Sequence, residues 1–173
     1  LRYRSSNHFS CPMVVRVPVG GGIRGGHYHP QSPETIFVHT AGLKVVCPSN
    51  PYGAKGLLLS AIRDNDPVLF FEPKRVYRAL KMDVPEEEYL VPLSRAKVVR
   101  DGEQVTLVAW GAMLLEALAA AETTLEHGGG AKVAHLELGD GGGAARGRRL
   151  GVDVEDHVGI AVDHDLQAGP EFV

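Results

Sequence analysis

Two histidines and a glutamine alternate in the segment His-Tyr-His-Pro-Gln-Ser-Pro-Glu, residues 27–34. An imidazole has an ordinary pKa of about 6.5, so this residue type accepts and donates protons near neutral pH. His27 and His29 would also point to one side of an extended chain, which permits a metal site. A tetrahedral site needs two more ligands, and His39 and Glu34 stand at no recognised ligand spacing. From residue types alone, a histidine that packs or caps a loop is the simpler interpretation.

Two further groups have residue types that bind ligands in other proteins. Residues 20–25 (Gly-Gly-Gly-Ile-Arg-Gly) fit the G-x-G-x-x-G spacing, but no helix start follows them. We therefore interpret them as a bend that lets the chain approach a partner or ligand closely. Asp64 and Asp66 frame the end of a predicted helix, just before Pro67. Carboxylate oxygens in such a turn can hold a cation, and a solvated turn without a cation is equally expected.

These residues must be positioned by strands and helices that alternate along the chain. Runs rich in β-branched and apolar residues predict strands at Met13–Val19, Leu43–Cys47 and Val68–Phe71. Serine followed by proline and glutamate predicts a helix from residues 32–34 to about 40–42, and Asn50-Pro51 predicts a second helix that ends at residues 64–67. The alternation predicts an α/β fold with a parallel sheet and helices on both faces.

The second part of the chain has a different organisation. A polar stretch with Pro85 and three consecutive glutamates predicts a linker at 81–93, between domains at 1–80 and 94–138. The predicted elements of the second domain are strands at Ala96–Arg100 and Val105–Trp110, separated by the Asp101-Gly102 turn, a helix closed by Gly128, and a strand at Lys132–Leu138. Residues 139–173 show no periodicity, which is typical of a divergent or flexible tail.

Composition excludes some classes of partner. The formal charge of −3 and the isoelectric point near 6.2 provide no basic face for nucleic acid. No apolar run approaches the roughly 18–20 residues needed to cross a bilayer, so we expect no membrane partner. Cys11 and Cys47 lie far apart in the sequence, which favours a reducing, intracellular setting.

Five segments, in order, resemble the β subunit of the thiamine-diphosphate-dependent 2-oxoacid dehydrogenases, the decarboxylating (E1) component of those complexes. The likeness extends over roughly residues 1–125 and is closer to the branched-chain (2-oxoisovalerate) type than to the pyruvate type. It implies a transketolase-like pyrimidine-binding domain followed by the start of a transketolase C-terminal domain. The five segments are residues 27–34, Gly-Leu-Lys-Val-Val (42–46), Ala-Lys-Gly-Leu-Leu (54–58), Ala-Ile-Arg-Asp (61–64) and Phe-Phe-Glu-Pro-Lys (70–74).

The resemblance implies an enzyme that oxidatively decarboxylates a branched-chain 2-oxoacid and transfers the acyl group to lipoamide of the E2 component. Thiamine diphosphate would be shared with an α subunit that also holds Mg²⁺. The implied assembly is an α2β2 heterotetramer that meets a lipoylated E2 acyltransferase core. The implied location is the bacterial cytoplasm or the mitochondrial matrix.

The resemblance also assigns site residues. His29 would be the catalytic proton donor or relay, and His29 and Gln31 would contact the cofactor. Pro30 stands where the family usually has serine. In branched-chain members a structural K⁺ lies near the positions of Asp64, Met13, Ala61 and Asp66, although Ala61 and Asp66 replace commoner residues.

The chain starts at Leu1, in the middle of the family pattern, so we expect a fragment. The family glutamate that activates the aminopyrimidine would precede Leu1, and the isolated chain is therefore expected to be inactive. Two alternatives stay open: a pyruvate dehydrogenase E1 β subunit, and a non-catalytic, truncated α/β assembly module.

Overall fold

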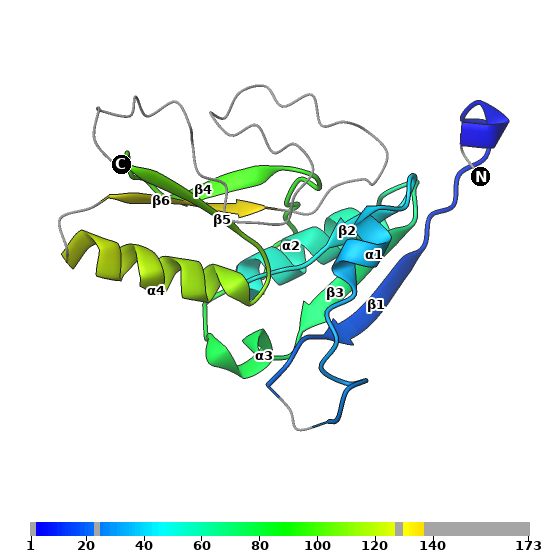
Figure 1. Cartoon of the computed structure of the whole chain (residues 1–173). Coiled ribbons are helices and arrows are strands. Elements are labelled where there is room, and N and C mark those ends of the chain that lie inside the picture. Colours follow the sequence, from blue (N-terminus) through cyan, green and yellow to red (C-terminus); the bar gives the residue numbers. More distant parts are fainter. Residues whose placement is uncertain (1–2, 23–24, 127–129, 137–173) are drawn as a thin grey trace, which may run out of the picture.

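The computed structural model describes residues 3–22, 25–126 and 130–136, arranged as two small α/β units joined by a linker (Figure 1). The predicted tail at 139–173 and the end of the last predicted strand lie outside the described residues. The elements are a 3₁₀ turn at Tyr3–Ser5, β1 (Val14–Val19), α1 (Glu34–Val38), β2 (Lys44–Val46), α2 (Pro51–Ile62), β3 (Val68–Pro73), α3 (Val76–Ala79), β4 (Ala96–Arg100), β5 (Val105–Ala109), α4 (Met113–Glu126) and β6 (Ala131–Leu136).

The first sheet is parallel, with the strand order β1-β3-β2. Neighbouring residues of its strands point to opposite faces, so both faces carry buried apolar side chains. Val45 and Phe71 pack on the α1 side, where the Phe37 and Phe71 rings lie 5.7 Å apart. Val46 and Phe70 pack on the α2 side. The prediction of a parallel sheet with helices on both faces is confirmed.

The starts of the two helices differ. Asn50 caps α2, because its Oδ1 accepts a hydrogen bond from Gly53 N at 2.7 Å, as its sequence predicts. The serine cap expected for α1 is wrong. The helix has 5 residues and begins at Glu34, so Pro33 occupies the cap position and Ser32 stands one residue before it. No side chain at the cap position forms a hydrogen bond to the helix.

The second sheet is mixed, with the order β4-β6-β5. β6 runs antiparallel to β4 and parallel to β5. The turn at Asp101–Gly102 therefore separates two strands that are not neighbours, and no hairpin forms there. α4 covers the sheet through Leu114 and Ala121, which pack on Val133.

The linker between the two units lies against α2. The Lys55 ammonium donates to the carbonyls of Pro85, Glu86 (3.1 Å) and Glu87 (3.0 Å). The Tyr89 ring stacks on Tyr52 at 4.4 Å. The segment that the sequence predicts as a linker is thus bound to α2 of the first unit through residues 85–89.

Candidate active site

The segment that carries His29 is a loop that follows β1. Gly20 N donates to Gln31 O at 2.9 Å, which ties the start of the loop to its end. Within the loop, Gln31 Nε2 donates to His27 O at 3.0 Å. Lys74, the residue after β3, donates its ammonium to His29 O. These bonds hold the backbone on both sides of His29 at the carboxyl ends of the parallel strands, where open α/β sheets bind their ligands.

The His29 imidazole itself is exposed. It stands beside Gly25, where an added Cβ would lie only 2.7 Å from the Cβ of His29. A side chain at position 25 would therefore displace the histidine, so glycine is required for this loop geometry. The loop thus combines a fixed backbone with an imidazole that is open to a ligand or a partner chain.

A cavity of about 480 Å³ lies beside the start of this loop, where the two units meet. His29 does not line it. One carboxylate oxygen of Glu34, Oε2, is buried there and has no hydrogen-bond partner among the described residues. A buried carboxylate oxygen requires a donor, so the cavity suits a group that brings an N–H or O–H. The walls come from Gly20–Gly22 after β1, Cys47 after β2, Pro73 at the end of β3, and residues 110–113 at the start of α4.

The end of β3 carries a second polar cluster. Glu72 accepts hydrogen bonds from Arg16 Nε at 2.5 Å and from the Tyr77 hydroxyl at 2.6 Å. Partial burial raises the pKa of Glu72, but the bonds from Arg16 and Tyr77 outweigh it, so that the pKa lies below its ordinary value. Partial burial together with the Glu72 carboxylate raises the pKa of Tyr77 to about 12. Glu72 is therefore a fixed anion.

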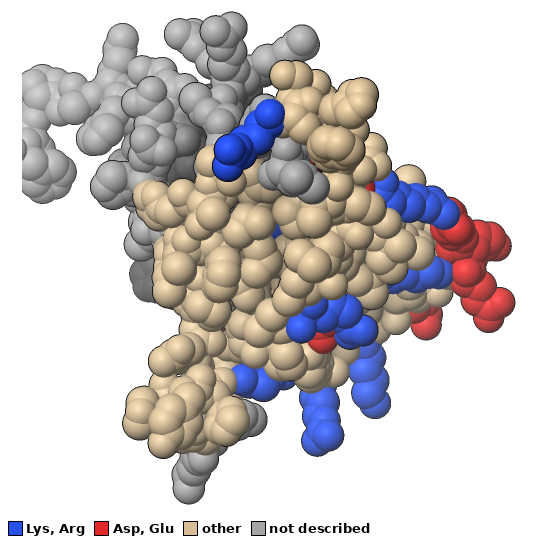
Figure 2. All heavy atoms as spheres, turned by 90° about the vertical axis from the view of Figure 1, so that its right-hand side faces the viewer, with Lys and Arg blue, Asp and Glu red and all other residues tan. Residues whose placement is uncertain are grey.

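Cationic side chains surround this end of the molecule. Figure 2 shows Lys and Arg side chains along its lower edge, the level at which α3 lies in Figure 1. In the sequence, Lys74, Arg75 and Arg78 fall on and before this helix. Arg75 pairs with Glu116 of α4, whereas the Lys74 ammonium donates to the His29 carbonyl and has no acidic partner among the described ion pairs. The region around the histidine loop therefore presents positive charge, which favours approach of anionic molecules.

The residues expected to bind potassium lie at the opposite ends of the strands. Asp64 and Asp66 precede β3, and both contact the ammonium of Lys44, at 2.7 Å and 3.3 Å. Partial burial lowers the pKa of Lys44, but the two carboxylates outweigh it and hold the pKa above its usual value. The Met13 carbonyl accepts from Val68 N at 2.8 Å, and the Ala61 carbonyl accepts from Asp64 N at 3.3 Å. Of the four expected residues, Asp64 and Asp66 contact the Lys44 ammonium, whereas the Met13 and Ala61 carbonyls accept backbone N–H groups.

Two further features apply to the described residues alone. No three His, Cys, Asp or Glu side chains gather there in a way that would hold a metal ion. None of the helices there has the length and apolar composition that crossing a bilayer requires. The potassium site stays a prediction. Both carboxylate oxygens of Asp64 accept hydrogen bonds from the Lys44 ammonium, and one also accepts from Asp66 N.

Two functional residues are not predicted from the sequence. The sequence places Glu34 at a helix start and at no ligand spacing, whereas its carboxylate lines the cavity. The sequence places Lys44 in a strand, and its partner Asp64 lies 20 residues further along the chain. In both cases the available signal is a charged residue next to an apolar run.

Two family models match the chain. The pyrimidine-binding domain of transketolase matches residues 1–79, and the C-terminal domain of transketolase matches residues 94–138. Among solved structures, a split-gene transketolase described as an inactive β4 tetramer superposes with a TM-score of 0.58 at 20% identity, over 72% of this chain and 39% of that one. The likeness to this structure supports the fold alone.

Three curated relatives are much closer in sequence. The 2-oxoisovalerate dehydrogenase subunit beta of Bacillus subtilis (strain 168) is 52% identical over 136 residues, which cover 79% of this chain and 42% of the relative. The mitochondrial 2-oxoisovalerate dehydrogenase subunit beta 2 of Arabidopsis thaliana is 57% identical, over 65% of this chain and 32% of the relative. The pyruvate dehydrogenase E1 component subunit beta of Acholeplasma laidlawii is 54% identical, over 67% and 36%. The chain thus spans less than half the length of these relatives.

Proposed function

The chain belongs to the transketolase-like β subunits of the 2-oxoacid dehydrogenases, and on that premise we propose that it serves in the oxidative decarboxylation of a branched-chain 2-oxoacid. In this reaction the carboxyl carbon of the 2-oxoacid leaves as carbon dioxide. The acyl group that remains forms a bond to one sulfur of the lipoamide disulfide, and the other sulfur becomes a thiol. The lipoamide is thereby reduced as the substrate carbon is oxidised.

The observation that carries the proposal is the geometry around His29, in the loop that follows β1. The loop fixes the backbone around His29 at the carboxyl ends of the parallel strands and leaves the imidazole exposed. An exposed, positioned imidazole fits the task of holding or moving a proton at one of its ring nitrogens while the substrate reacts. The positive surface near Lys74 fits a substrate that carries a carboxylate.

Thiamine diphosphate is the cofactor of this proposal, and when bound it supplies the carbon nucleophile and the electron sink for decarboxylation. His29 and Gln31 would face it from the β side. Gln31 is held in place, since its side chain already donates to His27 O and its carbonyl accepts from Gly20 N. The diphosphate and its Mg²⁺ are assigned to an α subunit, so the site is complete only in an assembly.

The partners follow from this division of the site. We propose an α2β2 heterotetramer with an α subunit and transfer of the acyl group to a lipoylated E2 core. The named relatives include a bacterial protein and a mitochondrial one. A bacterial cytoplasm or a mitochondrial matrix is the corresponding location.

The test is calorimetry on the chain mixed with the α subunit of a 2-oxoisovalerate dehydrogenase, with thiamine diphosphate and Mg²⁺ as titrants. We expect saturable cofactor binding that His29→Ala weakens by about tenfold or more. His39→Ala removes an equally exposed histidine at the end of α1 and serves as the matched control, with unchanged binding. Absence of both assembly and cofactor binding would overturn the proposal and favour the non-catalytic assembly module.

A further readout uses the same complex. We expect 2-oxoisovalerate to bind the cofactor-loaded complex more tightly than pyruvate does; the reverse order would favour the pyruvate type.

A further inference from the structure

A cluster of paired charges lies away from the histidine loop, at the amino ends of the strands. The Lys44 ammonium donates to both oxygens of Asp64, at 2.9 and 2.7 Å, and lies 3.3 Å from Asp66 Oδ2. The side chains of these residues are only 17–22% exposed. Asp66 N also donates to Asp64 Oδ1 at 2.8 Å, which fixes the turn. An amine is thus enclosed by carboxylate oxygens on a rigid turn.

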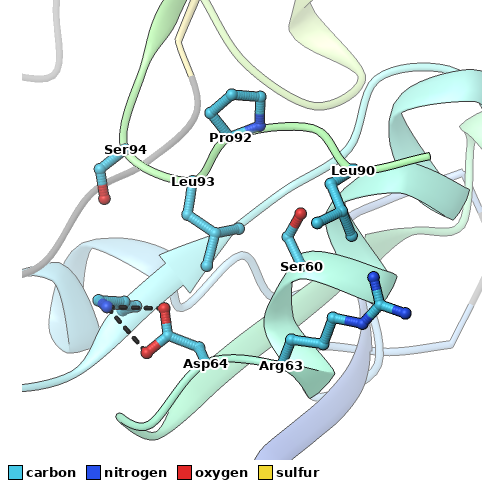
Figure 3. A pocket seen from close by; sticks show the side chains of 8 residues that line it. Ser60, Arg63, Asp64, Leu90, Pro92, Leu93 and Ser94 are labelled. Carbon is cyan, nitrogen blue, oxygen red and sulfur yellow. Dashed lines mark hydrogen bonds and ion pairs between the residues drawn. The ribbon is translucent and has the colours of Figure 1, made fainter.

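A pocket of about 570 Å³ gives access to this cluster. Figure 3 shows Asp64 at the base of the pocket, with its two hydrogen bonds to the Lys44 ammonium, while the Leu93 side chain points toward the pair from the linker. Ser60 closes another side and donates to Val91 O at 2.6 Å, so the linker is held over the pocket. Arg63 also lines the pocket and pairs with Glu88 of the linker.

An ammonium group and a potassium ion have the same charge and nearly the same size, and both prefer oxygen partners. Two such cations side by side repel each other, and the second gains little where carboxylate oxygens already serve the first. The carbonyls of Met13 and Ala61, the other two expected ligands, accept the backbone N–H groups of Val68 and Asp64. The carboxylate oxygens of the turn thus already serve one monovalent cation, the Lys44 ammonium.

We propose that the Lys44 ammonium takes the place of a monovalent metal ion at the Asp64–Asp66 turn, so that the fold of the first unit does not depend on potassium. The inference concerns stability and is independent of the proposed catalytic function. An ion that binds only the folded chain raises its stability in proportion to the logarithm of its concentration. Potassium independence is thus directly measurable.

The experiment compares thermal unfolding of the full chain in potassium, sodium and tetramethylammonium chloride at equal ionic strength. The tetramethylammonium ion is too large for the turn and reports the salt effect alone. We expect the same midpoint in all three salts. A midpoint that rises specifically with potassium concentration would overturn the proposal, because it would show that the wild-type chain binds the ion.

Variants of Lys44 complete the test. Lys44→Met keeps the aliphatic stem and removes the charge, and we expect its midpoint to fall by about 3–8 °C in sodium. We expect potassium to restore at least half of that loss, since the two carboxylates then lack a cation. Lys44→Arg should remain independent of potassium, and Lys81→Met, at an exposed lysine, is the matched control.

Each outcome decides the matter. If the unfolding midpoint of Lys44→Met does not rise with potassium, the proposal is overturned, because Lys44 would then be an ordinary ion-pair partner and not a substitute for a metal ion. Should that variant fail to fold, the salt comparison on the wild-type and Lys44→Arg chains still distinguishes the two cases, since potassium dependence in either of them excludes a built-in cation.

Discussion

His135 illustrates how a single titratable residue can set the acid stability of the chain. Its side chain is 4% exposed in the middle strand of the second sheet. Burial, with a smaller contribution from the charge of Lys97, lowers the pKa of His135 to about 4. In the unfolded chain the histidine returns to about 6.5. The unfolded state therefore binds more protons than the folded state between these two values.

The first prediction follows from that difference. The free energy of unfolding should fall as pH drops from about 6.5 to about 4, by up to about 3 kcal/mol, and should be unaffected by His135 above that window. His135→Gln should flatten this dependence. Urea unfolding at several pH values measures it, with His39→Gln as the control at an exposed histidine. Equal pH slopes for wild type and His135→Gln would contradict the prediction.

For single residues, the sequence predicts which side chains take part in a site better than it predicts their burial and their partners. His29 could be singled out because it stands in a recognisable segment. The buried state of Glu34 Oε2 could not, because it depends on residues 110–113, which are remote in the chain. The same holds for Lys44, whose carboxylate partners lie in the turn between α2 and β3. The burial of Glu34 and the ion pairs of Lys44 both depend on contacts between residues far apart in the chain, which the spacing of residues in the sequence does not predict.

Among the elements, α2 makes the tightest contact with the linker. An added Cβ at Gly56 would lie 2.5 Å from Val91 Cγ2 and 2.8 Å from the Tyr89 ring. At Gly53, one turn earlier, the nearest atom would be 3.4 Å away. Both glycines are buried in the same helix. They therefore form a matched pair that separates helix propensity from packing.

The second prediction uses this pair. Gly56→Ala should destabilise the chain by about 1–3 kcal/mol because it forces the linker away from α2. Gly53→Ala should be neutral or stabilising by up to about 1 kcal/mol, because alanine favours the helix. Protease cleavage within residues 81–93 should accelerate only in Gly56→Ala. Similar cleavage rates in the two variants would show that Gly56 does not hold the linker.

A helix or strand is predicted well from the sequence when the residues that determine it are close together in the chain. α2 is predicted well because Asn50 and Pro51 act within one helical turn. The order β4-β6-β5 is not, because β6 inserts between two strands that are neighbours in sequence. α1 is shorter than its start signal suggests, since the chain bends away after Val38. Local chemistry sets where elements begin, and tertiary pairing sets how they are ordered.

The whole molecule depends on a small contact between its two units. Trp110 packs against the cluster of Val19, Val45, Cys47 and Phe71, and Arg75 bonds Glu116. Gly111 has a φ of +53°, and an added Cβ there would lie 2.6 Å from Cys47 Sγ. This glycine is needed both for its backbone conformation and for the close approach of the units.

The third prediction concerns cooperativity. Gly111→Ala should separate the two units and convert one unfolding transition into two, because each unit keeps its own core. Differential scanning calorimetry would show this directly. Gly21→Ala serves as control, because nothing lies within 4 Å of a Cβ at that position. A single transition in Gly111→Ala would mean that the linker alone couples the units.

The first sheet also sets how far its two ends can influence each other. β1 has 6 residues, and at about 3.3 Å per residue it separates the Lys44 turn from the histidine loop by about 20 Å. At an effective dielectric constant of about 20, two unit charges that far apart interact by less than about 1 kcal/mol. Salt in the surrounding water weakens the solvent-exposed part of this interaction further. Distance thus decouples the two ends of the sheet, so one end can be altered in evolution or by design with little effect on the electrostatic environment of the other.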